Sequence, residues 1–182
     1  MGKVSTNWKT LSKKNLVSNK YINLWEEQVE RPDGNMSTYY VFRREPFSIV
    51  IPYEDGKVIL TKQYRYAINT ITLEFPMGFA EGKSPYDTAE TELREEAGIT
   101  AAQLTEVGNF WVGSGKTDQV AYVYLAENLI HGEQELEDGE FIELERYSID
   151  EVGAMIRRGE MRDGPSIVAY HYLVDYLKEH QS

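Results

Sequence analysis

Three glutamates close together in the chain have the clearest potential for chemistry. In a helix that turns about 100° per residue, Glu92, Glu95 and Glu96 fall within one arc of about 100°. The neighbouring arc is apolar and should face a core (Tyr86, Ala89, Leu93, Ala97). Like charges at this spacing destabilise an isolated helix by roughly a few tenths of a kcal/mol per pair. A divalent cation would reverse that penalty, because Mg²⁺ takes carboxylate oxygens as ligands. The same pattern also suits a solvated acidic face.

The helix that would present these glutamates has signals at both ends. Ser84 is a suitable N-cap, Pro85 suits the first helical position, and Asp87 complements the helix dipole. Gly98 stands where a left-handed residue commonly ends a helix. We therefore predict a helix over residues 85–97.

This helix and the loop before it resemble the sequence box of the Nudix hydrolases, Gly-x5-Glu-x7-Arg-Glu-U-x-Glu-Glu-x-Gly-U, where U is aliphatic. The second half of the box matches throughout (Glu92, Leu93, Glu95, Glu96, Gly98 and Ile99). In the first half, Lys83 and Thr91 replace the box glutamate and arginine, and Gly78 lies one residue too near Lys83. In the family these two residues pair and brace the loop. Their joint loss leaves no unpartnered charge, so it affects loop geometry more than metal binding.

Two further stretches resemble the ADP-ribose and nucleotide-sugar pyrophosphatases within that family. The run 63–65 is similar to their Gln-Tyr-Arg, which makes Arg65 a candidate contact for substrate phosphate. A guanidinium group suits phosphate oxygens, although an arginine at a strand end can also simply be solvated. The stretch 73–78 is similar to Leu-Glu-x-Pro-Ala-Gly. This resemblance assigns Met77 a metal-binding backbone carbonyl and places Glu74 at the substrate.

A glycine-containing loop and an N-terminal aromatic residue are further binding candidates. The run 113–115 falls where this subfamily has Ser-Pro-Gly before a substrate loop, which makes Gly115 a candidate for substrate binding. With the following Lys-Thr it also resembles the end of a P-loop, but that motif needs a glycine where this chain has Phe110. Trp25 is a candidate for stacking a base, although aromatic residues in a hairpin more often pack in a core or interface.

An acidic stretch over residues 133–143 is typical of a solvated loop. In the ADP-ribose pyrophosphatases that the chain resembles, a glutamate from this loop binds a third metal ion or activates water. Alignment of the strand that follows favours Glu140 for that role, with Glu137 and Asp138 as alternatives. Functional residues often lie on such loops.

The remaining signals predict an α+β fold, which the resemblance specifies as the αβα sandwich of the Nudix fold. We expect six strands and two further helices (47–53, 57–64, 73–75, 104–112, 120–125, 141–147; 148–158, 165–179). The N-terminal part is predicted as an antiparallel β hairpin with its turn at 31–35. Because a lone hairpin is marginal in water, residues 1–45 are predicted to be a β-strand dimerisation segment and residues 46–182 the Nudix hydrolase domain.

Composition excludes several classes of protein. The chain has no cysteine, which excludes disulfide scaffolds, thiolate metal sites and a cysteine nucleophile. Its formal net charge of −11 disfavours a nucleic-acid partner. No apolar run reaches the roughly 18 residues of a membrane span, and no signal-peptide core is visible. We therefore expect a cytoplasmic protein without a membrane partner.

The resemblance implies a Mg²⁺-dependent pyrophosphatase, with Mn²⁺ as an alternative and two or three ions per site. Glu92, Glu95, Glu96 and Glu140 would be catalytic and, with the Met77 carbonyl, would hold the metal. The expected substrate is ADP-ribose or a nucleoside diphosphate sugar, split into a nucleoside monophosphate and a sugar phosphate by a homodimer. A Nudix enzyme acting on nucleoside triphosphates, a catalytically weakened Nudix-fold nucleotide-binding or regulatory module, and an acidic domain without metal stay open.

Overall fold

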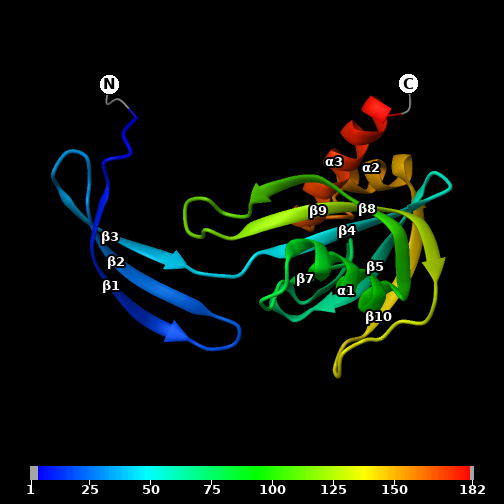
Figure 1. The fold of residues 1–182 in the computed structure, drawn as a ribbon, viewed down its shortest axis with the longest axis horizontal. Coiled ribbons are helices and arrows are strands. Elements are labelled where there is room, and N and C mark those ends of the chain that lie inside the picture. Colours follow the sequence, from blue (N-terminus) through cyan, green and yellow to red (C-terminus); the bar gives the residue numbers. More distant parts are fainter. Residues whose placement is uncertain (1–3, 181–182) are drawn as a thin grey trace. The chain divides into compact units, whose positions relative to one another are not determined.

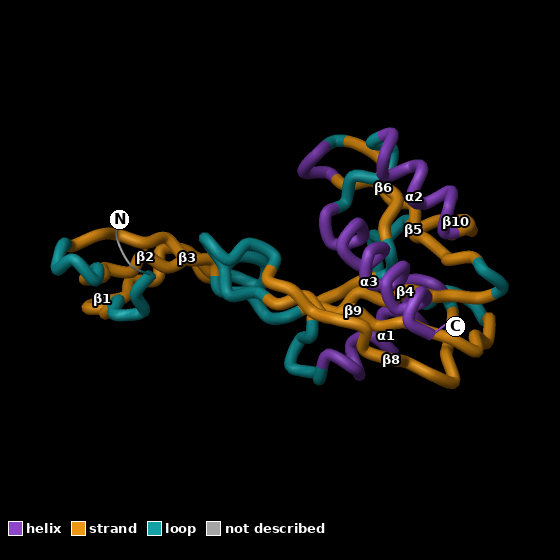
Figure 2. The backbone as a smooth tube through the Cα atoms, turned by 90° about the horizontal axis from the view of Figure 1, so that it is seen from above, coloured by secondary structure: helices purple, strands orange, loops and turns teal. Residues whose placement is uncertain are grey.

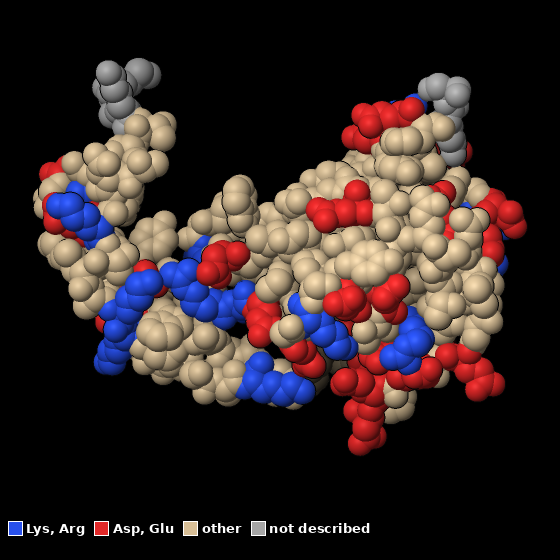
Figure 3. Space-filling view, viewed as in Figure 1, with Lys and Arg blue, Asp and Glu red and all other residues tan. Residues whose placement is uncertain are grey.

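The computed structural model of the protein describes residues 4–180 and contains two compact units. The first unit is the chain up to Glu45 together with Trp111–Gln119, and the second is Pro46–Phe110 together with the chain from Val120 onward. The first contains nine basic and six acidic residues (+3), and the second ten and twenty-four (−14). Blue atoms are frequent over the first unit in Figure 3, and red atoms over the second. The acidic excess of the chain therefore belongs to the unit that contains the glutamate helix.

The first unit is built on a three-stranded antiparallel sheet in the order β1-β2-β3 (Figure 1). Its strands are β1 (Lys9–Ser18), β2 (Asn23–Glu30) and β3 (Met36–Phe42). The predicted hairpin is present as β2 and β3, with Gly34 at a positive φ of 79° in the turn between them. β1 is a strand that the sequence did not indicate. Two irregularities in its pairing with β2 interrupt the period of two that identifies a strand in a sequence.

An ion-pair network connects the parts of this first unit. Glu27 on β2 is only 5 % exposed and accepts a hydrogen bond of 2.7 Å from Arg43. Arg43 also binds Asp118 at 2.7 Å, and Lys13 on β1 lies 3.4 Å from Glu27. Burial alone would raise the pKa of Glu27, but Arg43 and Lys13 outweigh it, so the pKa lies below its ordinary value. A buried carboxylate of this kind is stable only because it is paired.

The second unit has a mixed sheet in the order β10-β5-β4-β9-β8, with β6 beside β5 and β7 beside β4. Its strands are β4 (Phe47–Glu54), β5 (Lys57–Arg65), β6 (Thr70–Glu74), β7 (Met77–Phe79), β8 (Ile99–Trp111), β9 (Val120–His131) and β10 (Ile142–Ser148). Its helices are α1 (Pro85–Ala97), α2 (Ile149–Arg158) and α3 (Gly164–His180), with a short 3₁₀ turn at Tyr66–Ile68. β4 runs parallel to β9 and antiparallel to β5.

Helices cover this sheet on both faces, as the tube in Figure 2 shows. One buried cluster joins α1 to the sheet through Ala89 and Leu93. The other joins α2 and α3 to the opposite face through residues such as Met155 and Leu173. Successive residues of a strand point to opposite faces, so Val50 belongs to the first cluster and its neighbours on β4 to the second. The predicted αβα sandwich is confirmed.

The predicted helix ends are also confirmed. The Ser84 hydroxyl accepts the Asp87 N–H at 3.1 Å, and Gly98 ends α1 with a φ of 63°. Tyr86 is a correction, because it is 44 % exposed and not part of the core. It lies in the first turn of α1, where its ring packs edge-on against Tyr124. No helix within residues 4–180 is long and apolar enough to cross a membrane.

Candidate active site

The three box glutamates lie on α1 beside the bend between β6 and β7. Glu96 is 6 % exposed, and its Oε2 accepts the backbone N–H of Met77 at 2.9 Å. Glu92 and Glu95 are partly buried. The bend is held by a further bond of 2.9 Å from the Val50 N–H to the Pro76 carbonyl. Helix and loop are therefore joined at the residues that the sequence indicates for chemistry.

Gly78 is in direct contact with Glu92. A Cβ atom at position 78 would lie 2.1 Å from both Cδ and Oε1 of Glu92, and 2.4 Å from Oε2. These distances are far inside van der Waals contact, so the carboxylate occupies the space of the missing side chain. Only glycine lets the loop backbone approach the carboxylate this closely.

Burial and mutual repulsion act together on these carboxylates. Burial, together with the charges of Glu95 and Glu140, raises the pKa of Glu92 to about 7. Burial raises the pKa of Glu96 to about 8; the Met77 N–H opposes this shift, and the charges of Glu92 and Glu140 reinforce it. Clustered anions of this kind favour binding of a proton or a cation.

The donor set suits a divalent cation. Hard cations such as Mg²⁺ prefer carboxylate and backbone carbonyl oxygens, which is what α1 and the loop at Met77 offer. Within residues 4–180, no three acidic or histidine side chains already converge on a common ion position. The site therefore suits a divalent cation because of its oxygen ligands and the repulsion between its carboxylates, and not because the ligands already surround one ion position.

Arg65 and Glu74 form a two-pronged ion pair at the ends of β5 and β6. Nε and Nη2 of Arg65 donate to Oε1 and Oε2 of Glu74 at 2.9 and 2.5 Å. The Thr72 hydroxyl lies 2.5 Å from Oε1 of the same carboxylate. Glu74 is 2 % exposed, whereas Arg65 is partly open to solvent. This burial favours a role for Glu74 in orienting Arg65 over contact with a substrate.

Asp163 and Ser166 support the same bend, and no sequence argument had singled them out. Ser166 Oγ accepts the Phe75 N–H at 3.0 Å, and Asp163 Oδ2 accepts the Ser166 N–H at 2.9 Å. Burial raises the pKa of Asp163, which also senses the charges of Glu74 and Arg65. From the sequence, Asp-Gly-Pro-Ser at residues 163–166 can be recognised only as a typical helix start. The contact with the bend depends on the tertiary fold.

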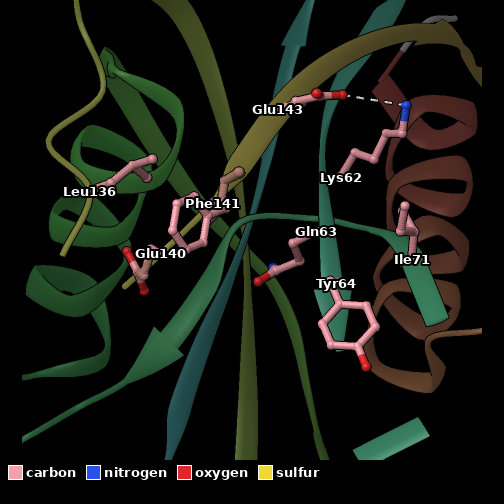
Figure 4. A pocket seen from close by; sticks show the side chains of 9 residues that line it. Lys62, Gln63, Tyr64, Ile71, Leu136, Glu140, Phe141 and Glu143 are labelled. Atoms are coloured by element: carbon pink, nitrogen blue, oxygen red, sulfur yellow. Dashed lines mark ion pairs between the residues drawn. The ribbon is translucent and has the colours of Figure 1, made fainter. Parts of the chain in front are cut away.

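The acidic loop reaches the neighbourhood of α1. The charge of Glu140 acts on both Glu92 and Glu96, and that of Glu137 acts on Glu92. Glu140 also lines a cavity of about 470 Å³ (with Lys62, Gln63, Tyr64, Ile71, Leu136, Phe141, Ile142 and Glu143). In Figure 4, Leu136 and Glu140 lie on the side of this cavity near α1, opposite Ile71. The structure shows no comparable link from Asp138 within residues 4–180.

Lys83 and Thr91, which replace the bracing pair of the box, still contact each other. Lys83 Nζ lies 3.3 Å from the Thr91 hydroxyl, which in turn donates to the Asp87 carbonyl at 2.9 Å. The loop thus retains a side-chain link to α1 at these positions. The link places a positive charge within electrostatic range of Glu92, whose pKa it lowers in part.

Two predicted binding residues, Trp25 and Gly115, belong to the first unit. Trp25 lies on β2, partly buried, and its indole N–H donates to Asn23 Oδ1 at 2.8 Å. Gly115 lies in the loop between β8 and β9, with open space around it. Their roles toward a substrate remain predictions.

The fold and site described above define a hydrolase-type αβα domain with a carboxylate-bearing helix, and comparisons with known proteins agree. Residues 42–170 match the NUDIX domain model, so the chain belongs to the Nudix family. Residues 8–42 match the model described as the nucleoside diphosphate sugar hydrolase N-terminal domain. The predicted family and the prediction of a Nudix enzyme are confirmed.

Similar proteins span nearly the whole chain. An ADP-ribose pyrophosphatase of Bacillus subtilis is 34% identical over 175 residues, 94% of each chain. A methanol dehydrogenase activator of Bacillus methanolicus is 29% identical over 169 residues, 91% of each chain. A solved structure described as an ADP compounds hydrolase superposes with a TM-score of 0.88 at 19% identity, covering 98% of both chains. This last likeness shows the shared fold.

Proposed function

We propose that this enzyme hydrolyses the diphosphate bond of ADP-ribose or a nucleoside diphosphate sugar, giving a nucleoside monophosphate and a sugar phosphate. The observation that carries the proposal is the buried Glu96 carboxylate, bound to the Met77 N–H beside Glu92 and Gly78. The name of the Bacillus subtilis relative and the description of the N-terminal match support this substrate class.

The carboxylates of Glu92, Glu95, Glu96 and Glu140 and the Met77 carbonyl would hold two or three Mg²⁺ ions, or Mn²⁺ in their place. Divalent cations at such a site neutralise the negative charge that develops on phosphate oxygens. The chain itself would keep the carboxylates together and exclude competing side chains through Gly78.

Arg65 is proposed to bind a substrate phosphate. Its Nε and Nη2 are engaged by Glu74, whereas Nη1 makes no hydrogen bond within residues 4–180. A guanidinium group held in this way loses little freedom when it binds an anion. Glu140 is proposed to act on the attacking water or as a further metal ligand, with Glu137 and Asp138 as alternatives.

We further propose a cytoplasmic homodimer that uses the first unit. On and beside its sheet this unit exposes large apolar side chains (Trp8, Leu11, Val17, Met36, Tyr39, Tyr40), and it also exposes the outer edge of β1 and most of that of β3, which isolated proteins normally cover. Trp25 and Gly115 would then contribute to substrate binding. Sedimentation of the full chain tests this proposal, because a single species near 21.0 kDa at micromolar concentration would contradict the dimer.

The function is tested by measuring nucleoside monophosphate release from ADP-ribose, nucleoside diphosphate sugars and nucleoside triphosphates, with Mg²⁺ and with EDTA. We expect Mg²⁺-dependent cleavage of one of the first two classes and little cleavage of triphosphates. Preferred cleavage of triphosphates would overturn the substrate class. Binding of ADP-ribose without cleavage of any of these compounds would overturn the hydrolase proposal.

A further inference from the structure

The acidic loop is attached to the C-terminal turn of α1 by three hydrogen bonds. The last carbonyls of a helix have no partner inside the helix, so another group must satisfy them. Here the Glu135 N–H donates to the Glu95 carbonyl at 3.0 Å, and the Gly132 N–H to the Gly98 carbonyl at 2.6 Å. Between them, Nε2 of Gln134 donates to the Glu96 carbonyl at 2.6 Å. The loop therefore caps the helix that presents the glutamates.

Packing and charge strengthen this attachment. A Cβ atom on Gly98 would lie 2.7 Å from the carbonyl carbon of Glu133, so the two backbones are in direct contact. Arg94 pairs with Glu95 on its own helix at 2.7 Å and with Glu135 on the loop. Loop and helix end thus behave as one packed element at residues 132–135.

Gln134 has a second bond that reaches the far end of the loop. The same Nε2 lies 3.4 Å from the carbonyl of Ile142, the first residue of β10. One side-chain amide therefore links α1 to both ends of the segment 135–141, which contains Glu140. Inside the segment, Oε2 of Glu140 accepts the Glu137 N–H at 3.0 Å, which orients that carboxylate locally.

We infer that Gln134 is a positioning residue that holds Glu140 at its place near α1, the helix that presents Glu92 and Glu96 (Figure 4). Glu140 stands only two residues before the carbonyl that Gln134 binds, so a shift at Ile142 is passed on through a short piece of chain. The role in turnover rests on the proposed function, whereas the attachment of the loop does not.

The test compares Gln134→Glu with Gln103→Glu. The first variant keeps the size of the side chain but turns a carboxylate toward two carbonyl oxygens. The second makes the same chemical change at an exposed site on β8. With ADP-ribose and Mg²⁺, we expect Gln134→Glu to lower kcat about 10- to 100-fold with KM changed less than about threefold, because small misplacements of catalytic groups cost rate. Gln103→Glu should match the wild type.

A second measurement does not depend on turnover. Hydrogen exchange should be at least about tenfold faster at the amides of Gly132 and Glu135 in Gln134→Glu, because their bonds to α1 open more often. Unchanged exchange would overturn the attachment, even if no substrate were cleaved by any form. Faster exchange in a protein that cleaves none of the tested compounds would support the attachment and contradict only the proposed function.

A double-mutant cycle separates positioning from general support. If Gln134 acts through Glu140, adding Gln134→Glu to Glu140→Gln should lower kcat by less than about twofold further. Independent, multiplying losses would overturn the inference, because they would show that Gln134 affects turnover by another route.

Discussion

Replacing Gly78 by alanine should separate activity from stability. The new Cβ would stand 2.1 Å from Cδ and Oε1 of Glu92, whereas ordinary contact begins near 3.4 Å. The Glu92 carboxylate must therefore move by about 1.3 Å. A displacement of about 1 Å at a catalytic group can cost about 100-fold in rate. We expect kcat for ADP-ribose hydrolysis to fall by about two orders of magnitude.

The free energy of unfolding should change much less. Gly78 does not have a positive φ, and the clashing atoms are the end of a flexible side chain that can rotate away. Such a rotation costs about 1 kcal/mol. The assay is steady-state hydrolysis with Mg²⁺, beside thermal unfolding followed by circular dichroism. Gly164→Ala is the matched control, because a Cβ at position 164 meets no atom within 4 Å.

Two results would refute this reasoning. A kcat within threefold of the wild type in a folded Gly78→Ala protein would show that the position of Glu92 is unimportant for turnover. A collapse of thermal stability would show that the backbone around Gly78, and not the Glu92 side chain, takes up the clash.

Three further variants test other parts of the structure. Glu96→Gln removes one charge without changing size and should lower turnover at least about 100-fold in a folded protein; near-wild-type turnover at saturating Mg²⁺ would remove Glu96 from the metal site. Lys83→Glu combined with Thr91→Arg should change activity less than about tenfold, because these residues already connect loop and helix; a gain of about 1,000-fold would mark the natural protein as a degenerate enzyme. The pKa of Glu27 is lowered from 4.5, so its pairing with Arg43 stabilises the fold fully above that pH and progressively less as pH falls through the folded pKa. Unfolding at about pH 5 and about pH 3 should therefore differ less in Glu27→Gln than in the wild type; an unchanged difference would contradict the assigned pairing.

Local signals were sufficient for α1 and its glutamates. The cap at Ser84, the left-handed Gly98 and the spacing of Glu92, Glu95 and Glu96 involve residues at most a few positions apart. Interactions between residues so close in the chain can be recognised in the sequence, so the helix and its acidic arc could be predicted. The capping box of Ser148 and Glu151 at the start of α2 is equally local, because these residues are three positions apart.

The alternation of polar and apolar residues did not predict a strand whose pairing is irregular. β1 was not predicted, because its pairing with β2 shifts register twice and its residues are exposed throughout. A strand of this kind is defined by its neighbour and not by its own alternation. Tyr86 shows the converse, since its place on the apolar arc was regular but the first turn of α1 leaves it exposed.

Only the tertiary structure decided how the glutamates are supported. The bond from Gln134 to the Glu96 carbonyl spans 38 residues, and that from Phe75 to Ser166 spans 91. The contact of Arg65 with the buried Glu74 is likewise not set by strand register, which pairs Arg65 with Thr70 and Glu74 with Thr61. Sequence spacing determines which residues share one face of a helix, because the helix repeats every 3.6 residues. The tertiary fold determines which distant carbonyl, amide or carboxylate contacts that face. Contacts between distant parts of the chain have no regular spacing, so a sequence pattern does not reveal them.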